Sequence, residues 1–201
     1  MMALSKKRNR ESGREMRKIL VVIDMQNDFI DGALGTKEAE AIVDNVVAKI
    51  KDYPKEDVYA TQDTHEEDYL LTQEGKNLPV EHCIRGTKGW EIRPEIARLL
   101  ESDHIYEKPT FGSVALAEQL KRIAFEDLER ENLSDSSDSA GIEIELVGLC
   151  TDICVVSNAL LLKAEMPEIK ISVDPACCAG VTPEKHAAAL ATMESCQIQI
   201  K

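Results

Sequence analysis

The sequence predicts an α/β fold in which a mostly parallel six-stranded sheet lies between two layers of helices. Six short segments of strand type alternate along the chain with five segments of helical periodicity. The first strand candidate is a continuous run of aliphatic residues, which is typical of a strand buried on both faces. The chain has 201 residues, 43% of them hydrophobic, which is enough to form the core of one domain.

The elements follow one another in a regular order. The strand candidates are residues 18–24, 57–62, 104–107, 142–149, 168–174 and 197–200. The helix candidates are residues 36–53, 91–100, 113–130, 152–164 and 182–193. Thr36 and Thr182 are placed to cap two of these helices, and Pro183 suits a first helical position. In such folds ligands bind beyond the carboxyl ends of the strands, so the residues that follow each strand are the candidates for chemistry.

Two segments fall outside this pattern. Residues 1–18 hold seven basic and two acidic residues, so we expect residues 1–17 to be a disordered basic tail before one domain at 18–201. Residues 129–141 are polar and rich in Ser and Asp, which indicates a surface loop.

Composition excludes several classes of partner. The formal net charge of -13 opposes binding to the phosphates of nucleic acids. No apolar run approaches the roughly 18 residues of a membrane helix, so we expect no membrane partner. Six cysteines are too few for a disulfide scaffold of this length, and no secretory leader is evident. We therefore expect reduced thiols and a cytoplasmic location.

Three reactive residue types occur at or just beyond predicted strand ends: Asp24, Lys108 and Cys154. Cys154 falls in the first turn of a predicted helix, where the helix dipole favours a thiolate. A carboxylate such as Asp24 could accept the thiol proton and return it to a leaving amine. Each residue alone also fits an ordinary role, as a loop cap, a solvated lysine or a packed thiol. Their joint placement favours a nucleophilic site.

Three motifs carry a family resemblance. Asp-x-Gln-Asn-Asp-Phe begins at residue 24, Lys-x-x-Phe-x-Ser at residue 108 and Gly-x-x-Thr-Asp-x-Cys-Val at residue 148. In this order they resemble the isochorismatase-like cysteine hydrolases, whose best-known metal-binding members are nicotinamidases. The resemblance spans residues 19–200. It implies the fold of that family and roles for Asp24 as acid and base, Lys108 as its partner and Cys154 as nucleophile.

The resemblance also implies an oxyanion hole and a cis peptide bond. In the family, the backbone N–H groups that correspond to Cys150 and Cys154 hold the developing negative charge. The peptide bond between Leu149 and Cys150 is expected to be cis, which for a non-proline residue costs about 3–4 kcal/mol.

A second set of residues suggests a divalent metal. Asp63 and His65 are two apart, so in an extended segment they point the same way. With His82 they offer two imidazoles and a carboxylate, which suit Zn²⁺, Fe²⁺ or Mn²⁺. The resemblance implies the same three ligands, and Glu74 stands in for a further histidine that many relatives have. A hydrogen-bonded loop pair and a structural histidine are the alternatives for these residues.

The resemblance implies the hydrolysis of nicotinamide through a thioester, a step of NAD salvage, by an enzyme that is often oligomeric. Phe29, Phe111 and Leu149 are the expected substrate contacts. The tryptophan that many nicotinamidases carry near the last metal ligand is replaced by Leu78 and Pro79. Two alternatives stay open: a hydrolase of another small amide, such as an N-carbamoyl or ureido compound, and a silent binding protein of the same fold.

Overall fold

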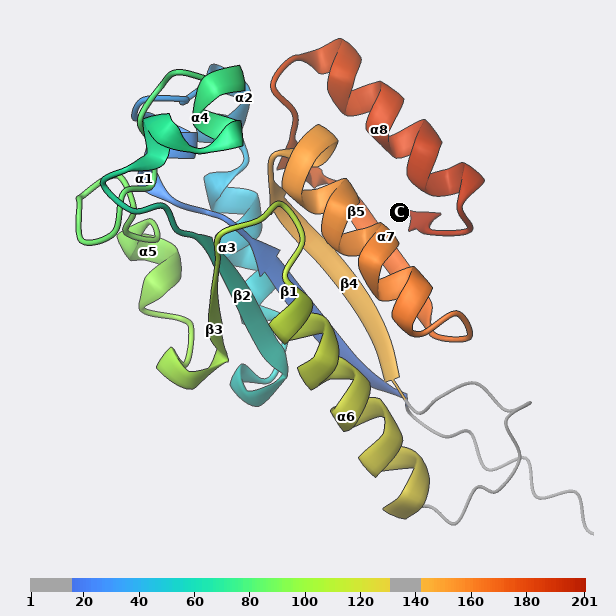
Figure 1. Cartoon of the computed structure of the whole chain (residues 1–201). Helices are drawn as coiled ribbons and strands as arrows, with labels where there is room; N and C mark the ends of the chain where they lie inside the picture. Colours follow the sequence, from blue (N-terminus) through green and yellow to red (C-terminus); the bar gives the residue numbers. More distant parts are fainter. Residues whose placement is uncertain (1–15, 131–141) are drawn as a thin grey trace, which may run out of the picture.

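The computed structural model describes residues 16–130 and 142–201 (Figure 1). Nearly all of the predicted basic tail, and most of the predicted loop at 129–141, lie outside the described residues. Within these two ranges no helix is long and apolar enough to cross a membrane.

The sheet has six strands in the order β3-β2-β1-β4-β5-β6, and every neighbouring pair is parallel. This confirms the predicted fold class. The strands are β1 (Arg17–Ile23), β2 (Val58–Asp63), β3 (Ile105–Lys108), β4 (Ile142–Leu149), β5 (Lys170–Ala179) and β6 (Gln199–Ile200). In the centre of the sheet, Val21 of β1 lies opposite Leu146 of β4.

Helices cover both faces of the sheet (Figure 1). One layer consists of α6 (Val114–Arg130), α7 (Val156–Glu165) and α8 (Pro183–Ser195), and the other contains α3 (Val43–Lys51) and α5 (Pro94–Ala97). Alternate residues of β1 pack against the two helical layers. Val21 packs in the core under α6 and α7, and Val22 packs in the core under α3. The unbroken apolar sequence of β1 therefore fills two cores at once.

Several element boundaries differ from the prediction. The helix predicted at 36–53 is two helices, α2 (Lys37–Ala41) and α3, separated at Ile42. The helix predicted at 91–100 is only α5, and the one predicted at 152–164 begins with a π-helical turn, η4 (Thr151–Val155), before α7. Strand β5 continues to Ala179, beyond its predicted end at 174.

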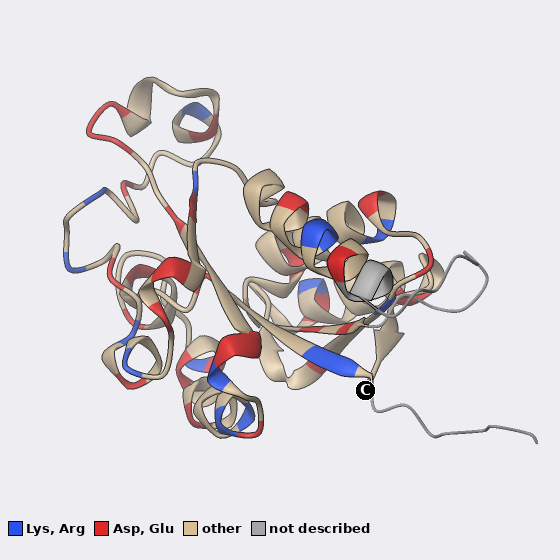
Figure 2. Ribbon diagram, turned by 90° about the horizontal axis from the view of Figure 1, so that it is seen from below, with Lys and Arg blue, Asp and Glu red and all other residues tan. Residues whose placement is uncertain are grey.

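The helix caps agree with the sequence. The hydroxyl of Thr36 accepts the N–H of Ala39, and the hydroxyl of Thr182 accepts the N–H of Lys185. The remaining short elements are α1 (Asn27–Ile30), α4 (Gln73–Asn77), η1 (Lys55–Asp57), η2 (Tyr69–Leu71) and η3 (Ser102–His104). Acidic residues are spread over the helices and connecting segments, while the strands are mostly uncharged (Figure 2).

Candidate active site

The three reactive residues meet at the carboxyl edge of the sheet. Asp24 follows β1, Lys108 ends β3, and Cys154 lies in the turn after β4. The Lys108 ammonium is 2.7 Å from Oδ2 of Asp24 and 3.5 Å from Sγ of Cys154. All three residues are buried, Asp24 completely. The sheet thus assembles an acid, a lysine and a thiol from segments far apart in the sequence.

Two features of the sheet hold Asp24 in place. The hydroxyl of Thr61, in β2, donates a hydrogen bond of 2.7 Å to Oδ1 of Asp24. On the other side, Gly148 of β4 has a φ of 120°, and a Cβ there would lie 2.1 Å from the carbonyl oxygen of Ile23. Only glycine allows β4 to approach the end of β1 this closely. The role of Thr61 was missed in the sequence, although a hydroxyl inside a buried strand is a signal for it.

The turn that carries the nucleophile is held by hydrogen bonds at its start. The carbonyl of Cys150 accepts the N–H groups of Ile153 and Val155, at 3.0 and 3.1 Å. The hydroxyl of Thr151 lies 2.8 Å from Nδ1 of His186, on α8. The bond between Leu149 and Cys150 is cis, as the resemblance implied.

Asn158, one turn beyond Cys154 on α7, joins the nucleophile turn to the segment after Lys108. Its side-chain N–H groups donate to the carbonyls of Cys154 and Phe111, at 2.8 and 3.1 Å. Its side-chain oxygen accepts the N–H of Ser113, at 2.9 Å. The sequence analysis missed this residue. A polar residue at helical spacing from the cysteine is the signal that could have found it.

The protonation of the site differs from the expectation. Burial, together with the charge of Asp24, raises the pKa of the Cys154 thiol well above its usual value, and Lys108 opposes this only in part. Burial therefore opposes the thiolate that the helix start and Lys108 are expected to favour. Burial lowers the pKa of Lys108, but the neighbouring acidic groups, Asp24 first and then Cys154 and Asp63, together more than compensate, so the net shift is upward and the ammonium stays charged.

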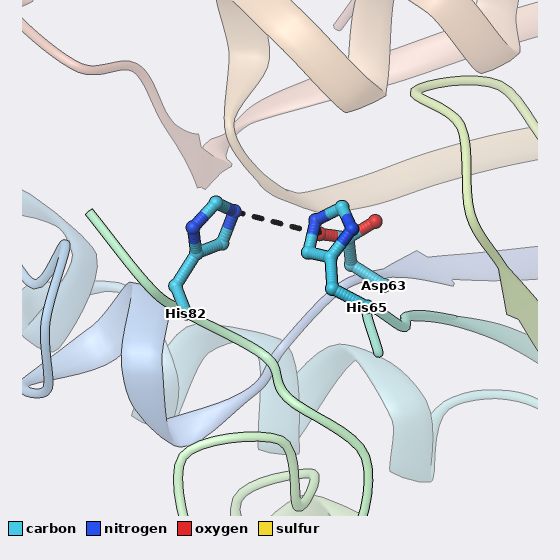
Figure 3. A group of neighbouring side chains, drawn as sticks. All are labelled: Asp63, His65 and His82. Carbon is cyan, nitrogen blue, oxygen red and sulfur yellow. Dashed lines mark ion pairs between the residues drawn. The ribbon is translucent and has the colours of Figure 1, made fainter. Parts of the chain in front are cut away.

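Three of the expected metal ligands, Asp63, His65 and His82, form a second cluster (Figure 3), and the Lys108 ammonium lies 3.2 Å from Asp63. Nε2 of His65 is 3.0 Å from Oδ2 of Asp63, and Nε2 of His82 is 3.8 Å from the same oxygen. One ligand atom from each of the three lies within 4.8 Å of the other two. Oε1 of Glu74, on α4, is 3.7 Å from Nε2 of His65 and 3.9 Å from Nε2 of His82. The fold thus brings all four predicted residues together.

The donor atoms of this cluster fit a divalent ion. Nδ1 of His82 lies 2.8 Å from the carbonyl of Val80, which fixes the proton on Nδ1 and leaves the lone pair of Nε2 facing the cluster. Nε2 of His65 is buried and, although close to Asp63, makes no hydrogen bond of good geometry with a described residue. Two imidazole nitrogens and two carboxylates suit Zn²⁺, Fe²⁺ or Mn²⁺.

The motif that begins at Asp24 also anchors the segment of the metal ligands. The Gln26 side chain accepts the N–H of Asp63 at 2.7 Å, and it donates to the carbonyls of Asp63 and Trp90 at 2.8 Å. Oδ2 of Asp28 accepts the N–H of Cys83, the neighbour of His82, at 2.8 Å. These anchoring roles depend on loops that are distant in the sequence and fold back against the motif, so they could not be predicted from the sequence.

A cavity of about 690 Å³ opens onto both clusters. Its lining includes Cys150, Cys154, Asp63, Glu74 and His82, and also the three expected substrate contacts, Phe29, Phe111 and Leu149. His65 and Lys108 line a separate groove on the far side of Glu74. The arrangement presents the Cys154 thiol and a group of candidate metal ligands to one cavity.

Residues 18–200 match the isochorismatase domain. The chain belongs to the isochorismatase family. The nicotinamidase/pyrazinamidase of Mycobacterium tuberculosis is 26% identical over 192 residues, which cover 90% of this chain and 96% of the relative. As a member of this family, the chain is a hydrolase.

Solved structures of family members agree with the fold. The pyrazinamidase of Pyrococcus horikoshii, crystallised in complex with zinc, superposes with a TM-score of 0.70 at 25% identity, covering 92% of this chain and 98% of that one. The nicotinamidase PncA of Bacillus subtilis gives a TM-score of 0.69 at 27% identity, covering 92% and 99%. The family fold therefore extends over nearly the whole chain.

Proposed function

We propose that the chain hydrolyses nicotinamide to nicotinate and ammonia through a thioester on Cys154, a reaction of NAD salvage. The observation that carries this proposal is the position of the Lys108 ammonium, 2.7 Å from Asp24 and 3.5 Å from Cys154, beside a cavity that the metal ligands also face. Family membership and the named activities of the relatives support the coarser activity, hydrolysis of an amide bond.

Acylation begins with the transfer of the Cys154 proton to the Asp24 carboxylate. Sγ forms a bond to the amide carbon, and the N–H groups of Cys150 and Cys154 receive the charge on the carbonyl oxygen. Asp24 gives its proton to the amide nitrogen. The C–N bond then breaks, releasing ammonia and leaving the thioester. Lys108 stabilises the negative charge as it moves between Asp24 and the sulfur.

Deacylation uses the same groups in reverse. Asp24, again a carboxylate, takes a proton from water as the water oxygen bonds to the thioester carbon. The C–S bond breaks and releases the carboxylic acid, and the Cys154 thiolate recovers the proton from Asp24. Both half-reactions therefore need Asp24 as a carboxylate; burial raises the pKa of Asp24, and Lys108 and Thr61 oppose this shift by stabilising the charged form.

Asp63, His65, Glu74 and His82 would hold a divalent ion, and we propose Zn²⁺ with Fe²⁺ and Mn²⁺ as the alternatives. When bound, the ion supplies a Lewis acid for the ring nitrogen of the substrate. Phe29, whose ring centroid is 5.5 Å from that of His82, would pack on the ring. Phe111 and Leu149 line the same cavity and would contact the substrate as well.

Ammonia release from nicotinamide tests the proposal, with Cys154→Ala as the control. We expect the metal-loaded enzyme to release ammonia and nicotinate in equal amounts, and the variant to release neither. If the loaded enzyme is inactive on nicotinamide but active on an N-carbamoyl amine, the substrate assignment is wrong and the cysteine chemistry stands. If alkylation of Cys154 leaves turnover unchanged, the nucleophile assignment is wrong.

Three broader expectations belong to the same proposal. Residues 18–201 act as one folded unit, the protein works in the cytoplasm, and it assembles as a homo-oligomer. Light scattering coupled to size-exclusion chromatography tests the last point directly, since a mass of 22.3 kDa would identify a monomer.

A further inference from the structure

Resting on the proposed function, we propose that the site accepts pyridine carboxamides that carry a fused apolar ring, and that Leu78 determines this breadth. The substrate class is then larger than nicotinamide itself. Three observations lead to this inference: the size of the cavity, the kind of side chain that forms its wall, and the position of Leu78 beside the metal ligands.

The cavity is larger than a single-ring amide needs. Its volume is about 690 Å³. Cavities of roughly 300–1,000 Å³ enclose ligands of the size of a typical drug, which contain two or more rings. Nicotinamide has one six-membered ring and a carboxamide, so it fills only part of this space even with an ion on the four ligands. The remaining volume is open to a substrate with more atoms.

The wall away from the catalytic residues is mainly apolar. Leu34, Leu78, Phe111 and Val181 come from four separate segments and all line the cavity. Three of them are unusually exposed for large apolar side chains: Leu78 by 37%, Val181 by 40% and Phe111 by 47%. A hydrocarbon ring placed among them would be removed from water together with these side chains, which favours binding.

Leu78 is fixed at the point where the wall meets the metal ligands. Its N–H donates to the carbonyl of Glu74 at 2.8 Å, and its carbonyl accepts the hydroxyl of Tyr69 at 2.9 Å. Both hydrogen bonds use the backbone, so a different side chain at position 78 would leave them intact. That side chain is one of those that limit the space beside Glu74.

Among the described residues, no tryptophan lines the cavity beside Leu78. Trp90 is the only tryptophan of the sequence. Its ring nitrogen donates to the hydroxyl of Thr64 at 2.9 Å, and Trp90 is not among the residues that line the cavity. Phe29 and Phe111 also line the cavity, but the side chain at position 78 itself is aliphatic and leaves room for a fused ring.

Quinoline-3-carboxamide is a suitable probe, because it keeps the ring nitrogen and the carboxamide of nicotinamide and adds one fused ring. We expect its kcat/KM to equal or exceed that of nicotinamide. Leu78→Trp should lower kcat/KM for the fused-ring amide by about tenfold or more, the effect of filling space in an apolar pocket, and change that for nicotinamide by less than about threefold. Leu71→Trp is the matched control, since Leu71 is 74% exposed and does not line the cavity.

Each outcome is decisive. Hydrolysis of nicotinamide without hydrolysis of the fused-ring amide overturns this inference and leaves the proposed function standing. Hydrolysis of the fused-ring amide alone supports the inference and overturns the assignment of nicotinamide as the substrate. Inactivity on both overturns both proposals. If Leu78→Trp slows both amides equally while its melting temperature matches that of Leu71→Trp, Leu78 does not set specificity. Leu78→Phe repeats the test with a smaller change if the tryptophan variant unfolds.

Discussion

At the scale of single residues, the ammonium group of Lys108 connects the two parts of the site. It lies 2.7 Å from Asp24, 3.2 Å from Asp63 and 3.5 Å from the Cys154 sulfur. A buried lysine with fewer anionic neighbours would lose its proton, because burial disfavours the charged form. Here the two carboxylates keep the charge in place, so one cation serves both the nucleophile and the metal ligands.

Asp24→Asn should make the Cys154 thiolate easier to form and yet reduce catalysis. The carboxylate of Asp24 raises the pKa of Cys154, and Lys108 lowers it. Removing the carboxylate leaves the lysine, so the thiol pKa should fall and alkylation by iodoacetamide should reach its maximal rate at a lower pH. Turnover should nevertheless fall by about 10²- to 10⁴-fold, because the proton carrier is lost.

The pH profile of alkylation at Cys154, followed by peptide mass spectrometry, measures this effect. Asp28→Asn is a matched control, since Asp28 holds a loop and does not contact the thiol. Both variants should be compared at equal metal content. A profile of Asp24→Asn that moves to higher pH would contradict the assigned electrostatics.

Glu74→Gln should weaken metal binding. The Glu74 carboxylate lies 3.7 Å and 3.9 Å from the two histidine nitrogens, so it supplies one of two negative charges in the cluster. We expect affinity for Zn²⁺ to fall by about tenfold or more, measured by competition with a chromogenic chelator. Glu66→Gln, an exposed carboxylate paired with Arg85, should change the affinity little. Equal affinities in the two variants would exclude Glu74 as a ligand.

Much of the site could be predicted from the residue types at the strand ends, but the residues that hold the site in place could not. Asp24, Lys108 and Cys154 could be predicted because parallel strands bring their carboxyl ends to one edge. Glu74 came only from the resemblance, since nothing in its sequence neighbourhood marks it as a ligand. Thr61 and Gln26 could not be assigned, because their partners depend on the pairing of β1 with β2 and on the return of a long loop.

At the scale of elements, the junction between η4 and α7 contributes both to the stability of the fold and to the geometry of the site. Asn158 is 2% exposed and makes three hydrogen bonds to the backbone. These bonds fasten the first turns of one helix to the loop that precedes another, α6. No regular secondary structure links the two segments at this point, so the side chain does so.

Asn158→Ala should lower the free energy of unfolding by about 2–4 kcal/mol, since it leaves buried backbone groups without partners. Urea unfolding followed by circular dichroism measures this change. Asn45→Ala is the control: Asn45 is exposed and makes one hydrogen bond, to Ala176, so its loss should cost less than about 0.5 kcal/mol. A similar loss in the two variants would show that Asn158 does not fasten the loop.

Positions of elements were more predictable than their continuity. Periodic apolar residues at 39, 42, 43, 46, 47 and 50 predicted one helix, yet the chain breaks it at Ile42. Both helices keep their apolar residues against the core, so the hydrophobic pattern does not reveal the break. The residue types of Thr151–Val155 do not distinguish a π-helical turn from an ordinary helical turn, so the sequence could not predict it.

At the scale of the whole molecule, one buried carboxylate connects a helix with the strands on one side of the sheet. Glu145, in the central strand β4, is 4% exposed. It accepts hydrogen bonds from Lys49 of α3 at 2.9 Å, from Tyr53 at 2.8 Å and from Lys201 after β6. Lys49 also pairs with Asp174 of β5 at 2.7 Å. The network ties a helix to three strands.

Glu145→Gln should destabilise the protein by about 2 kcal/mol at neutral pH, because its hydrogen bonds involve charged groups. Burial raises the pKa of Glu145, but the donors, Lys201 first, bring it below its usual value. The unfolded chain therefore binds the proton more readily. The stabilisation is present above about pH 4.3, the unfolded pKa, and is lost as the pH falls through the folded value.

Urea unfolding at pH 7.5 and at pH 4 tests this sign. The difference between the native protein and Glu145→Gln should be largest at pH 7.5 and shrink at pH 4. Glu143→Gln, which removes a pair with the exposed Lys170, should show a difference below about 0.5 kcal/mol at both pH values. A difference that grows on acidification would contradict the assigned pKa shift.

The anchoring of the metal-ligand segment has a consequence for how this protein can diversify. Gln26 and Asp28 fasten that segment at Asp63, Cys83 and Trp90 and leave the stretch from 66 to 80 largely free of the sheet. The groups that break the amide bond, by contrast, lie at or just beyond the ends of the strands. Apart from Glu74, the length and sequence between the fastened points can therefore change, and with them the amide that the site accepts, while the catalytic residues stay unchanged.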